Sequence, residues 1–406
     1  MPDILVFPRP APSEPSASEP YDRAALAELI AGLDATAAAR DQAGGTAKAE
    51  RDLIRASGLL ALTIPVELGG GGGDLADALD ITRQMAAVDS SLAHLFAFHH
   101  FQLATLRFYA PRRQWAPLLE ATAREGWFWG NALNPLDKTT FLTPGPDIGE
   151  YRVNGTKSFC SGASDSDMLI VSALRHDQPG LVVAAIPTDR DGVKVHDDWD
   201  NIGQRQTDSG RVSFRDVVVL DSEILREPGP LGSPFASLRS TLGQLILTHI
   251  YLGLAEGALT YASGNLDPQG VPWIASEATS VGQDPFILRN FGEYWVQAAG
   301  AGALTERARR QFRDAFSLGD QVTETLRGEV AISVATAKVA SARAALEISS
   351  RMFEVLGARS TAGKLRLDRF WRNARVHTLH DPIDYKLLEL GDWRLNGQLP
   401  LPSFYS

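Results

Sequence analysis

The sequence predicts a mostly α-helical α+β fold, in which a small central β-barrel or β-sandwich domain lies between two helical domains. The chain has 406 residues, of which 44% are hydrophobic and 22% charged, as in ordinary soluble proteins of two or three domains. Apolar residues recur at helical spacing in the first and last parts of the chain, as in Leu26, Leu29 and Leu33. The middle carries short β-branched or aromatic runs instead, such as Leu181–Ile186.

These patterns divide the chain into four segments. A Pro- and Ser-rich tail, expected to be disordered, precedes an N-terminal helical domain, a central β-domain and a C-terminal four-helix bundle domain that ends in a docking tail. The four segments cover residues 1–20, 21–122, 123–232 and 233–406.

Local motifs support this order. The glycine run at residues 69–73 is interpreted as a loop before a helix capped by Asp74, so we do not assign it to phosphate binding. The dipeptide Asn154-Gly155 predicts a hairpin turn in the β-domain. Helical periodicity predicts two long helices over Asp284–Leu318 and Thr323–Leu356.

Composition excludes several classes of protein. The net charge of -10 argues against nucleic acid as a partner. The most apolar stretch, Leu242–Ala262, contains Gln244, His249 and Glu256, so we expect a helix buried in protein rather than a membrane span. A single cysteine, Cys160, forms no internal disulfide, and no secretion signal is visible, so we expect a cytoplasmic protein.

Several longer motifs resemble the acyl-CoA dehydrogenase superfamily, and within it the dibenzothiophene monooxygenase group. The broad resemblance rests on IPVELGGGG at 64–72 and FWRNARVHTLHDP at 370–382. The narrower resemblance rests on five stretches: HLFAFHH (94–100), GNALNP (130–135), KSFCSGASDSD (157–167), DDWDNIGQRQTDSG (197–210) and EVLGARS (354–360).

The resemblance implies an acyl-CoA dehydrogenase-like fold and a flavin-dependent monooxygenase. Such an enzyme takes reduced FMN from a separate NAD(P)H:flavin reductase and uses O2, through a flavin hydroperoxide, to oxygenate a small apolar compound that contains sulfur or an aromatic ring. FAD is the alternative cofactor. The phenylalanines of HLFAFHH agree with an apolar substrate.

The resemblance also implies which residues form the site. It selects His99 and His380 as catalytic histidines, together with Ser161, whose hydroxyl would bond the flavin ring. The remaining flavin contacts would be made by Asn131, Phe159, Trp199 and Arg359. His94, His100 and His377 are interpreted as structural, Cys160 as a packing residue, and no metal site is expected because too few ligands recur at metal spacing.

Two features leave other functions open. Asp381 occupies the position of the dehydrogenase glutamate base, so an acyl-CoA dehydrogenase is one alternative, although Asp381-Pro382 is also typical of a helix N-cap. The relatives carry arginines for the flavin phosphate where this chain has Asp267 and Val271, which would weaken flavin binding and leaves a flavin-free scaffold as a second alternative.

The chain is expected to form a homotetramer. The long C-terminal helices are typical of an assembled bundle, and the final segment carries Leu399, Leu401, Phe404 and Tyr405, whose apolar surfaces gain by leaving water. We therefore expect this tail to dock on a neighbouring subunit.

Overall fold

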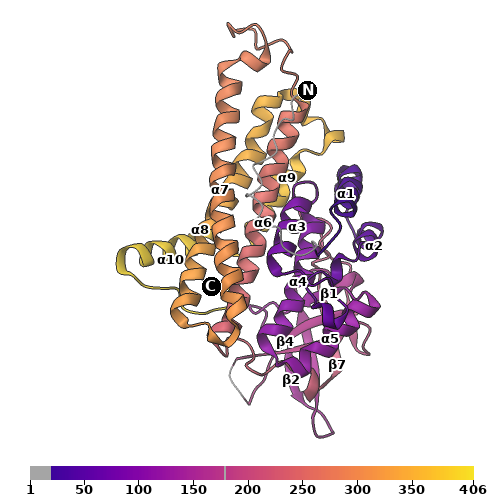
Figure 1. Cartoon of the computed structure of the whole chain (residues 1–406). Coiled ribbons are helices and arrows are strands. Elements are labelled where there is room, and N and C mark those ends of the chain that lie inside the picture. Colours follow the sequence, from indigo (N-terminus) through magenta and orange to yellow (C-terminus); the bar gives the residue numbers. More distant parts are fainter. Residues whose placement is uncertain (1–19, 178–179) are drawn as a thin grey trace.

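The computed structural model describes residues 20–177 and 180–406, so most of the predicted N-terminal tail lies outside the described residues. Helices come first, then a sheet, then long helices (Figure 1). This order confirms the predicted fold class. One apolar core runs through both helical parts, and a second, smaller one fills the β-domain.

Five α-helices form the N-terminal part. Asp74 caps α3 and shares a reciprocal capping box with Asp77, which confirms the interpretation of the glycine run before it. Almost every residue of α4 is buried, so this helix lies at the centre of the protein. The five helices are α1 (Arg23–Ala43), α2 (Lys48–Ala56), α3 (Leu75–Ala86), α4 (Ser90–Tyr109) and α5 (Arg112–Glu125).

The β-domain is one seven-stranded sheet. Its order is β1-β4-β2-β3-β7-β6, with β5 paired to β4, and the β1–β4 pair is parallel. β1 lies against α4, so the sheet meets the helical core along this edge. The strands are β1 (Trp129–Ala132), β2 (Phe141–Pro144), β3 (Glu150–Lys157), β4 (Met168–Leu174), β5 (Leu181–Pro187), β6 (Val193–Val195) and β7 (Val212–Leu220).

The predicted hairpin turn at Asn154-Gly155 is wrong, because both residues lie inside β3. The pairing of β3 with β7 shifts register between Val153 and Gly155, and Gly155 has φ 132°. A Cβ added at Gly155 would lie 2.2 Å from the backbone oxygen of Thr139. The glycine therefore permits an irregularity and a close backbone approach within the strand, rather than a turn.

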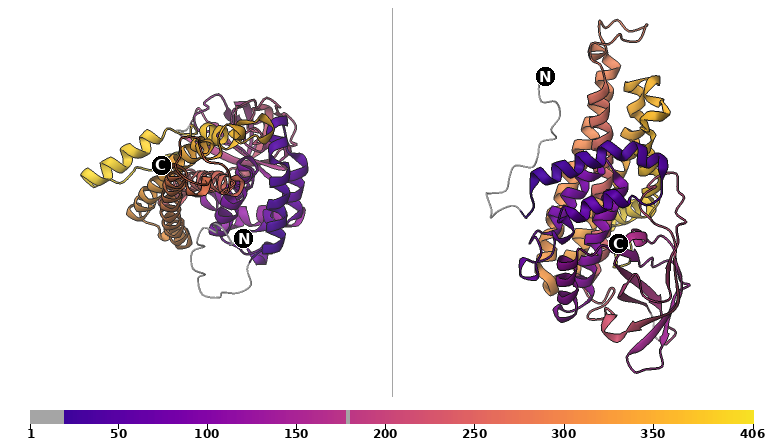
Figure 2. Two further views of the ribbon diagram at one scale, coloured as in Figure 1. Left: turned by 90° about the horizontal axis from the view of Figure 1, so that it is seen from above. Right: turned by 90° about the vertical axis from the view of Figure 1, so that its right-hand side faces the viewer.

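Five more α-helices follow, and α6 is their core. It contacts α3, α4, α7 and α8, and the predicted long helices correspond closely to α7 and α8. By length and composition α6 could cross a membrane, but 89% of its most apolar window is buried inside the protein. The helices are α6 (Pro234–Asn265), α7 (Pro285–Leu318), α8 (Glu324–Leu356), α9 (Asp368–His377) and α10 (Ile383–Asn396), and α10 projects away from the bundle in both views (Figures 1 and 2).

The tail after α10 folds back onto its own chain, and its docking on a neighbouring subunit stays a prediction, with Leu401 84% exposed. Arg327 of α8 donates to the carbonyl of Pro400 at 3.1 Å and to that of Ser406. Ser240 of α6 donates to the carbonyl of Ser403 at 2.5 Å. Polar donors on the chain's own helices therefore satisfy the tail's backbone, and Phe404 is partly buried against the bundle core.

Candidate active site

A cavity of about 1000 Å³ lies where the β-domain meets the helices, and four of the predicted site residues of the β-domain line it. It is at the upper end of the usual size for a cofactor or small-molecule site. Its wall comes from α4, the β-domain, α6, the α9–α10 connection and the tail. The residues used below are His94, Phe98, Phe101, Asn131, Phe159, Ser161, Trp199, Arg239, Gln244, His377, His380, Phe404 and Tyr405.

Ser161 is buried at the end of a short chain of hydroxyl groups. Its Oγ lies 2.8 Å from Oγ of Ser209, which in turn lies 2.8 Å from Oγ1 of Thr207. Thr207 donates to the carbonyl of Gln204 at 3.0 Å. Because each hydroxyl can both donate and accept, this chain fixes the Ser161 side chain while a lone pair or proton stays available to the cavity.

Two aromatic side chains flank Ser161. Phe159 is 60% exposed and has φ 57°, a left-handed conformation that is unusual for a bulky residue. Trp199 lies edge-on to it, with ring centroids 6.1 Å apart, and its Nε1 donates to the carbonyl of Gln204 at 2.7 Å. The fold thus presents an uncovered aromatic face to the cavity, as a site for a flat ring would require.

Asn131 joins this group from β1. Its backbone N–H donates to the carbonyl of Ser161 at 3.0 Å, which ties the two residues together. Its Oδ1 accepts from Leu133 N–H at 3.3 Å and from Gln102 at 3.4 Å, so the amide is oriented by its neighbours.

His99 does not line the cavity. Its Nε2 lies 2.8 Å from the carbonyl of Leu60, and its Nδ1 accepts from Trp129 N–H at 3.2 Å, so both ring nitrogens are used. Burial lowers the pKa of His99 to about 4, so the ring is neutral at pH 7. His99 thus connects α4 to β1 in this structure, and its catalytic role stays a prediction.

His94 lines the cavity in its place. Its ring stacks on Phe98 with centroids 3.9 Å apart, and its Nδ1 lies 3.1 Å from Nε2 of His377. Its Nε2 is buried without a hydrogen-bond partner among the described residues. Burial, and then the nearby charge of His380, lower the pKa of His94 to about 3, so the cavity holds a neutral imidazole with one nitrogen available to a ligand.

His380 is oriented by Asp381, and Asp381 by a buried lysine. Nδ1 of His380 lies 3.0 Å from Oδ1 of Asp381, and Nζ of Lys338 lies 2.6 and 2.7 Å from the two carboxylate oxygens. Burial raises the pKa of the Asp381 carboxyl, but the bond with His380 and the charge of Lys338 outweigh it and hold the pKa well below its usual range. An ionised carboxylate only accepts, so Nδ1 of His380 carries the proton in this contact.

The predicted N-cap role of Asp381 is wrong. The helix α10 begins at Ile383 with Pro382 as its N-cap residue, and no side chain caps it. Asp381 instead points toward α8, where Lys338 provides a full positive charge in place of helix N–H groups. The ion pair therefore replaces the expected cap.

Cys160 lies outside the cavity. It is buried, and burial raises the pKa of its thiol to about 12, in agreement with a packing role.

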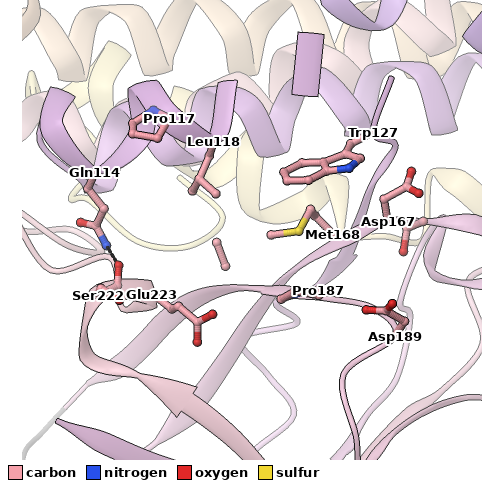
Figure 3. A pocket seen from close by; sticks show the side chains of 12 residues that line it. Gln114, Pro117, Leu118, Trp127, Asp167, Met168, Pro187, Asp189, Ser222 and Glu223 are labelled. Carbon is pink, nitrogen blue, oxygen red and sulfur yellow. Dashed lines mark hydrogen bonds between the residues drawn. The ribbon is translucent and has the colours of Figure 1, made fainter. Parts of the chain in front are cut away.

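A second hollow of about 560 Å³ lies between α5 and the β-domain, and Figure 3 shows Trp127 and Met168 there and Gln114 bonded to Ser222. It contains none of the predicted site residues. Within residues 20–177 and 180–406, no group of three metal-type ligands occurs.

Comparison with known proteins identifies the family. Three models of the acyl-CoA dehydrogenase family match the chain in order: the N-terminal domain at residues 24–125, the middle domain at 134–217 and the C-terminal domain at 245–385. The probable FMNH2-dependent monooxygenase SfnC of Pseudomonas putida is 49% identical over 97% of this chain and 99% of its own length. The chain belongs to the acyl-CoA dehydrogenase family.

Two solved structures of this family place the chain within its monooxygenase branch. Methanesulfinate monooxygenase MsuC from Pseudomonas fluorescens has a TM-score of 0.92 and 50% identity, covering 96% of this chain and 100% of that one. FMN-bound TdsC from Paenibacillus sp. A11-2, a dibenzothiophene monooxygenase, has a TM-score of 0.90 and 41% identity, covering 94% and 99%. The resemblance drawn from the motifs is confirmed, and the chain is an oxidoreductase of the monooxygenase kind.

Arg359, predicted to contact the flavin phosphate, and the positions where the relatives carry arginines for it lie away from this cavity. Arg359 is exposed, in the 3-10 helix Ala358–Thr361 that follows α8. Asp267 and Val271 follow the end of α6, about 30 Å along the helix axis from its last cavity residue, Leu247. In this member of the acyl-CoA dehydrogenase family, none of the three contacts the chain's own cavity.

The cavity residues that sequence reasoning did not find include His94, Gln244 and Arg239. Lys338, which holds Asp381 from behind the cavity, was also missed. The helices that carry them are apolar on nearly all sides, so hydrophobic periodicity did not distinguish the face that lines the cavity. A buried Lys or Arg requires a partner, so a charged residue within an apolar helical run was the feature that could have indicated a polar site.

Proposed function

We propose that this protein is an FMN-dependent monooxygenase that adds one oxygen atom to the sulfur of a small organosulfur compound. The observation that carries the proposal is the meeting of Phe159, Ser161 and Trp199 with the histidines His94 and His380 around one cavity. Relatives named for FMNH2 dependence and for sulfur substrates support it.

The residues present fit a flavin. An exposed phenylalanine held in the left-handed region costs free energy, and a flat ring stacked beside it would cover its apolar face. Ser161 and Asn131 would lie at the polar edge of that ring as hydrogen-bonding groups. Phe159, Trp199, Ser161 and Asn131 are thus the residues that would hold the isoalloxazine.

Bound reduced FMN supplies two electrons, so that one atom of O2 passes to the sulfur and the other leaves as water. The chain's residues keep that chemistry dry and manage the proton. Phe98, Phe101 and the tail residue Phe404 line the cavity with apolar surface, which limits water. His380, fixed through Nδ1 by Asp381, leaves Nε2 free to hold or pass a proton.

Asp381 gives little support to the dehydrogenase alternative. A base that removes an α-proton needs a free carboxylate, whereas both oxygens of Asp381 accept from Lys338 and one also meets His380. The lowered pKa makes this carboxylate a weak base.

The test supplies reduced FMN and oxygen and looks for the oxygenated product. Purified protein is mixed in air with FMN, NADH and a flavin reductase, and methanesulfinate or dibenzothiophene is added while product is measured by mass spectrometry. Product should carry one ¹⁸O from ¹⁸O2. A parallel assay with chemically reduced FMN and no reductase tests whether the enzyme can use free reduced FMN without contact with the reductase. Oxidation of an acyl-CoA with no oxygenated sulfur product would contradict the proposal.

We also propose that the enzyme works in the cytoplasm, where NAD(P)H and a flavin reductase would be available to it. Its single thiol agrees with a reducing compartment, since it offers no internal disulfide.

A further inference from the structure

Two arginines of the cavity wall, Arg239 and Arg375, make no ion pair among the described residues, and Arg239 is the more deeply buried of the two. Arg239 of α6 is 4% exposed and lines the cavity. Its guanidinium lies 4.1 Å from the centre of the Phe101 ring and 5.6 Å from that of Tyr109, and its Nε donates to the Thr105 hydroxyl at 2.7 Å. Across residues 20–177 and 180–406, no carboxylate lies within ion-pair distance of this group, and its nearest electrostatic partner is Tyr109.

Several other buried arginines of the protein are compensated. Arg51 pairs with Asp208 at 2.8 Å, and Arg40 pairs with Asp89 at 2.5 Å. Arg327 is bonded to the tail carbonyls described above. Leaving a guanidinium buried without an anion is costly, because the lost hydration is repaid only in part by aromatic rings and one hydroxyl. Arg239 therefore lacks what the fold provides elsewhere.

A series of aromatic contacts links Arg239 to His94 in the cavity. Phe101 meets Phe98 with ring centroids 5.5 Å apart, and Phe98 stacks on His94, so one line of rings joins Arg239 to His94. Seven residues of α4 separate His94 from Phe101, which is about 10 Å along the helix. The carboxylates that line the cavity lie elsewhere: Asp137 bonds Ser158 and Thr139, and Asp200 is exposed. Asp381, next to His380, is paired with Lys338.

We propose that Arg239 binds the oxyanion of the substrate, and that this substrate is an alkanesulfinate rather than a neutral thiophene. The proposal rests on the proposed function and names its substrate class. A sulfinate, RSO2⁻, offers two oxygens that accept from a guanidinium fork, while the sulfur keeps a lone pair for the incoming oxygen. The reaction balances as RSO2⁻ + O2 + FMNH2 giving RSO3⁻ + FMN + H2O. The rings of Phe101 and Phe98 would receive the alkyl group.

The test measures binding by calorimetry, without turnover. Full-length wild type, Arg239→Met and Arg239→Lys are each titrated with sodium methanesulfinate, with uncharged dimethyl sulfoxide, with FMN and with riboflavin. The control is Arg107→Met, which removes a partly buried arginine on α4 that also lies over aromatic rings but does not line the cavity. Circular dichroism checks that each variant is folded.

We expect Arg239→Met to weaken methanesulfinate binding about tenfold to a hundredfold, and to change dimethyl sulfoxide, FMN and riboflavin binding less than threefold. The lysine variant should fall in between, because an ammonium cannot form the two parallel bonds, and it serves as the test if the methionine variant does not fold. Arg107→Met should bind methanesulfinate as wild type does.

Three results would overturn the inference. Unchanged methanesulfinate affinity in both variants would make Arg239 a packing residue. Loss of FMN affinity with riboflavin unaffected would assign Arg239 to the flavin phosphate. If the wild type oxygenates dibenzothiophene but neither binds nor oxidises methanesulfinate, this inference is wrong and the proposed function stands. If it oxygenates no sulfur compound, the proposed function itself is wrong.

Discussion

Side chains in and beside the cavity differ in whether other groups of the protein already occupy their hydrogen-bonding atoms. Asp381 is fully engaged by Lys338 and His380, and Asn131 is held through its oxygen and its backbone. Nε2 of His94 has no partner among the described residues, and the hydroxyl of Ser161 has one. These two open groups, the imidazole of His94 and the hydroxyl of Ser161, are neutral at pH 7, which suits an oxygenation that a misplaced base would spoil.

Ser161→Ala should uncouple the reaction while leaving the fold intact. The substitution removes one buried hydrogen-bonding group worth about 1 to 3 kcal/mol, and the oxygenated state of the site should lose its protection by that amount. Product per FMN oxidised should fall and hydrogen peroxide should rise, both measured with an oxygen electrode and catalase. Ser166→Ala is the matched control, because Ser166 bonds Thr188 in the β-domain outside the cavity. Equal coupling in wild type and Ser161→Ala would remove Ser161 from the site.

Asp381→Asn should destabilise the protein at neutral pH, because it leaves Lys338 buried without its partner. The loss should be about 3 to 5 kcal/mol. The folded-state pKa of Asp381 is depressed, so its contribution is complete above the unfolded value of about 4 and is lost as pH falls below that. Urea unfolding at pH 7 and at pH 3 should show the difference between wild type and variant narrowing in acid. A gap at pH 3 as large as that at pH 7, or an equal loss in the exposed control Asp384→Asn, would disprove the ion-pair account.

Four of the predicted site residues of the β-domain lie around one cavity and His99 on α4 does not, and this difference has a physical cause. Phe159, Ser161, Trp199 and Asn131 sit in motifs on strand ends and loops, where an unusual residue has few structural explanations. On α4 three histidines occupy a helix that is buried all round, so no polar face distinguishes the one that meets the cavity. Only the packing of α4 between β1 and α9 decides between His94 and His99.

Among the secondary-structure elements, the helices followed the sequence more closely than the strands did. Capping residues and long apolar periods define α3, α7 and α8 locally. The pairing of β3 depends on contacts far apart in sequence, so the same Asn-Gly dipeptide that usually makes a turn is carried inside a strand by β7 on one side and β2 on the other.

Gly155→Val should lower the free energy of unfolding by about 2 kcal/mol or more, because a side chain would meet the Thr139 backbone and φ 132° is strained for any L-residue. Chemical denaturation followed by fluorescence measures this. Gly302→Ala in α7 is the control: nothing lies within 4 Å of its added Cβ, and helix propensity favours alanine. A Gly155→Val protein as stable as wild type would mean that the irregularity in β3 is free to move.

At the scale of the whole molecule, α10 is the feature that a single chain leaves unexplained. It projects from the bundle and has one buried residue, Lys386, while Tyr385, Leu388 and Leu395 are more than three-fifths exposed (Figure 2). Apolar groups displayed on a projecting helix favour contact between copies of the chain. We therefore propose that α10 takes part in the contacts of the predicted homotetramer.

Light scattering should give about four times the 43.9 kDa chain mass. The double variant Leu388→Ser with Trp393→Ser should shift the population toward smaller species, since it removes exposed apolar surface from α10. Asp392→Ser on the same helix serves as the control and should keep the wild-type mass. A wild type at 43.9 kDa, or a double variant with unchanged mass, would rule out assembly through this helix.

The burial of Cys160 makes the protein convenient for site-specific labelling. It is the chain's one cysteine, and its thiol is shielded from solvent with a pKa near 12, so maleimide reagents should leave it unmodified. A cysteine introduced at Leu401, which is 84% exposed on the tail, would then carry a fluorophore as the sole dye. The fluorescence anisotropy of this dye, measured as substrate is added, would show whether the tail stays packed beside the cavity when substrate binds.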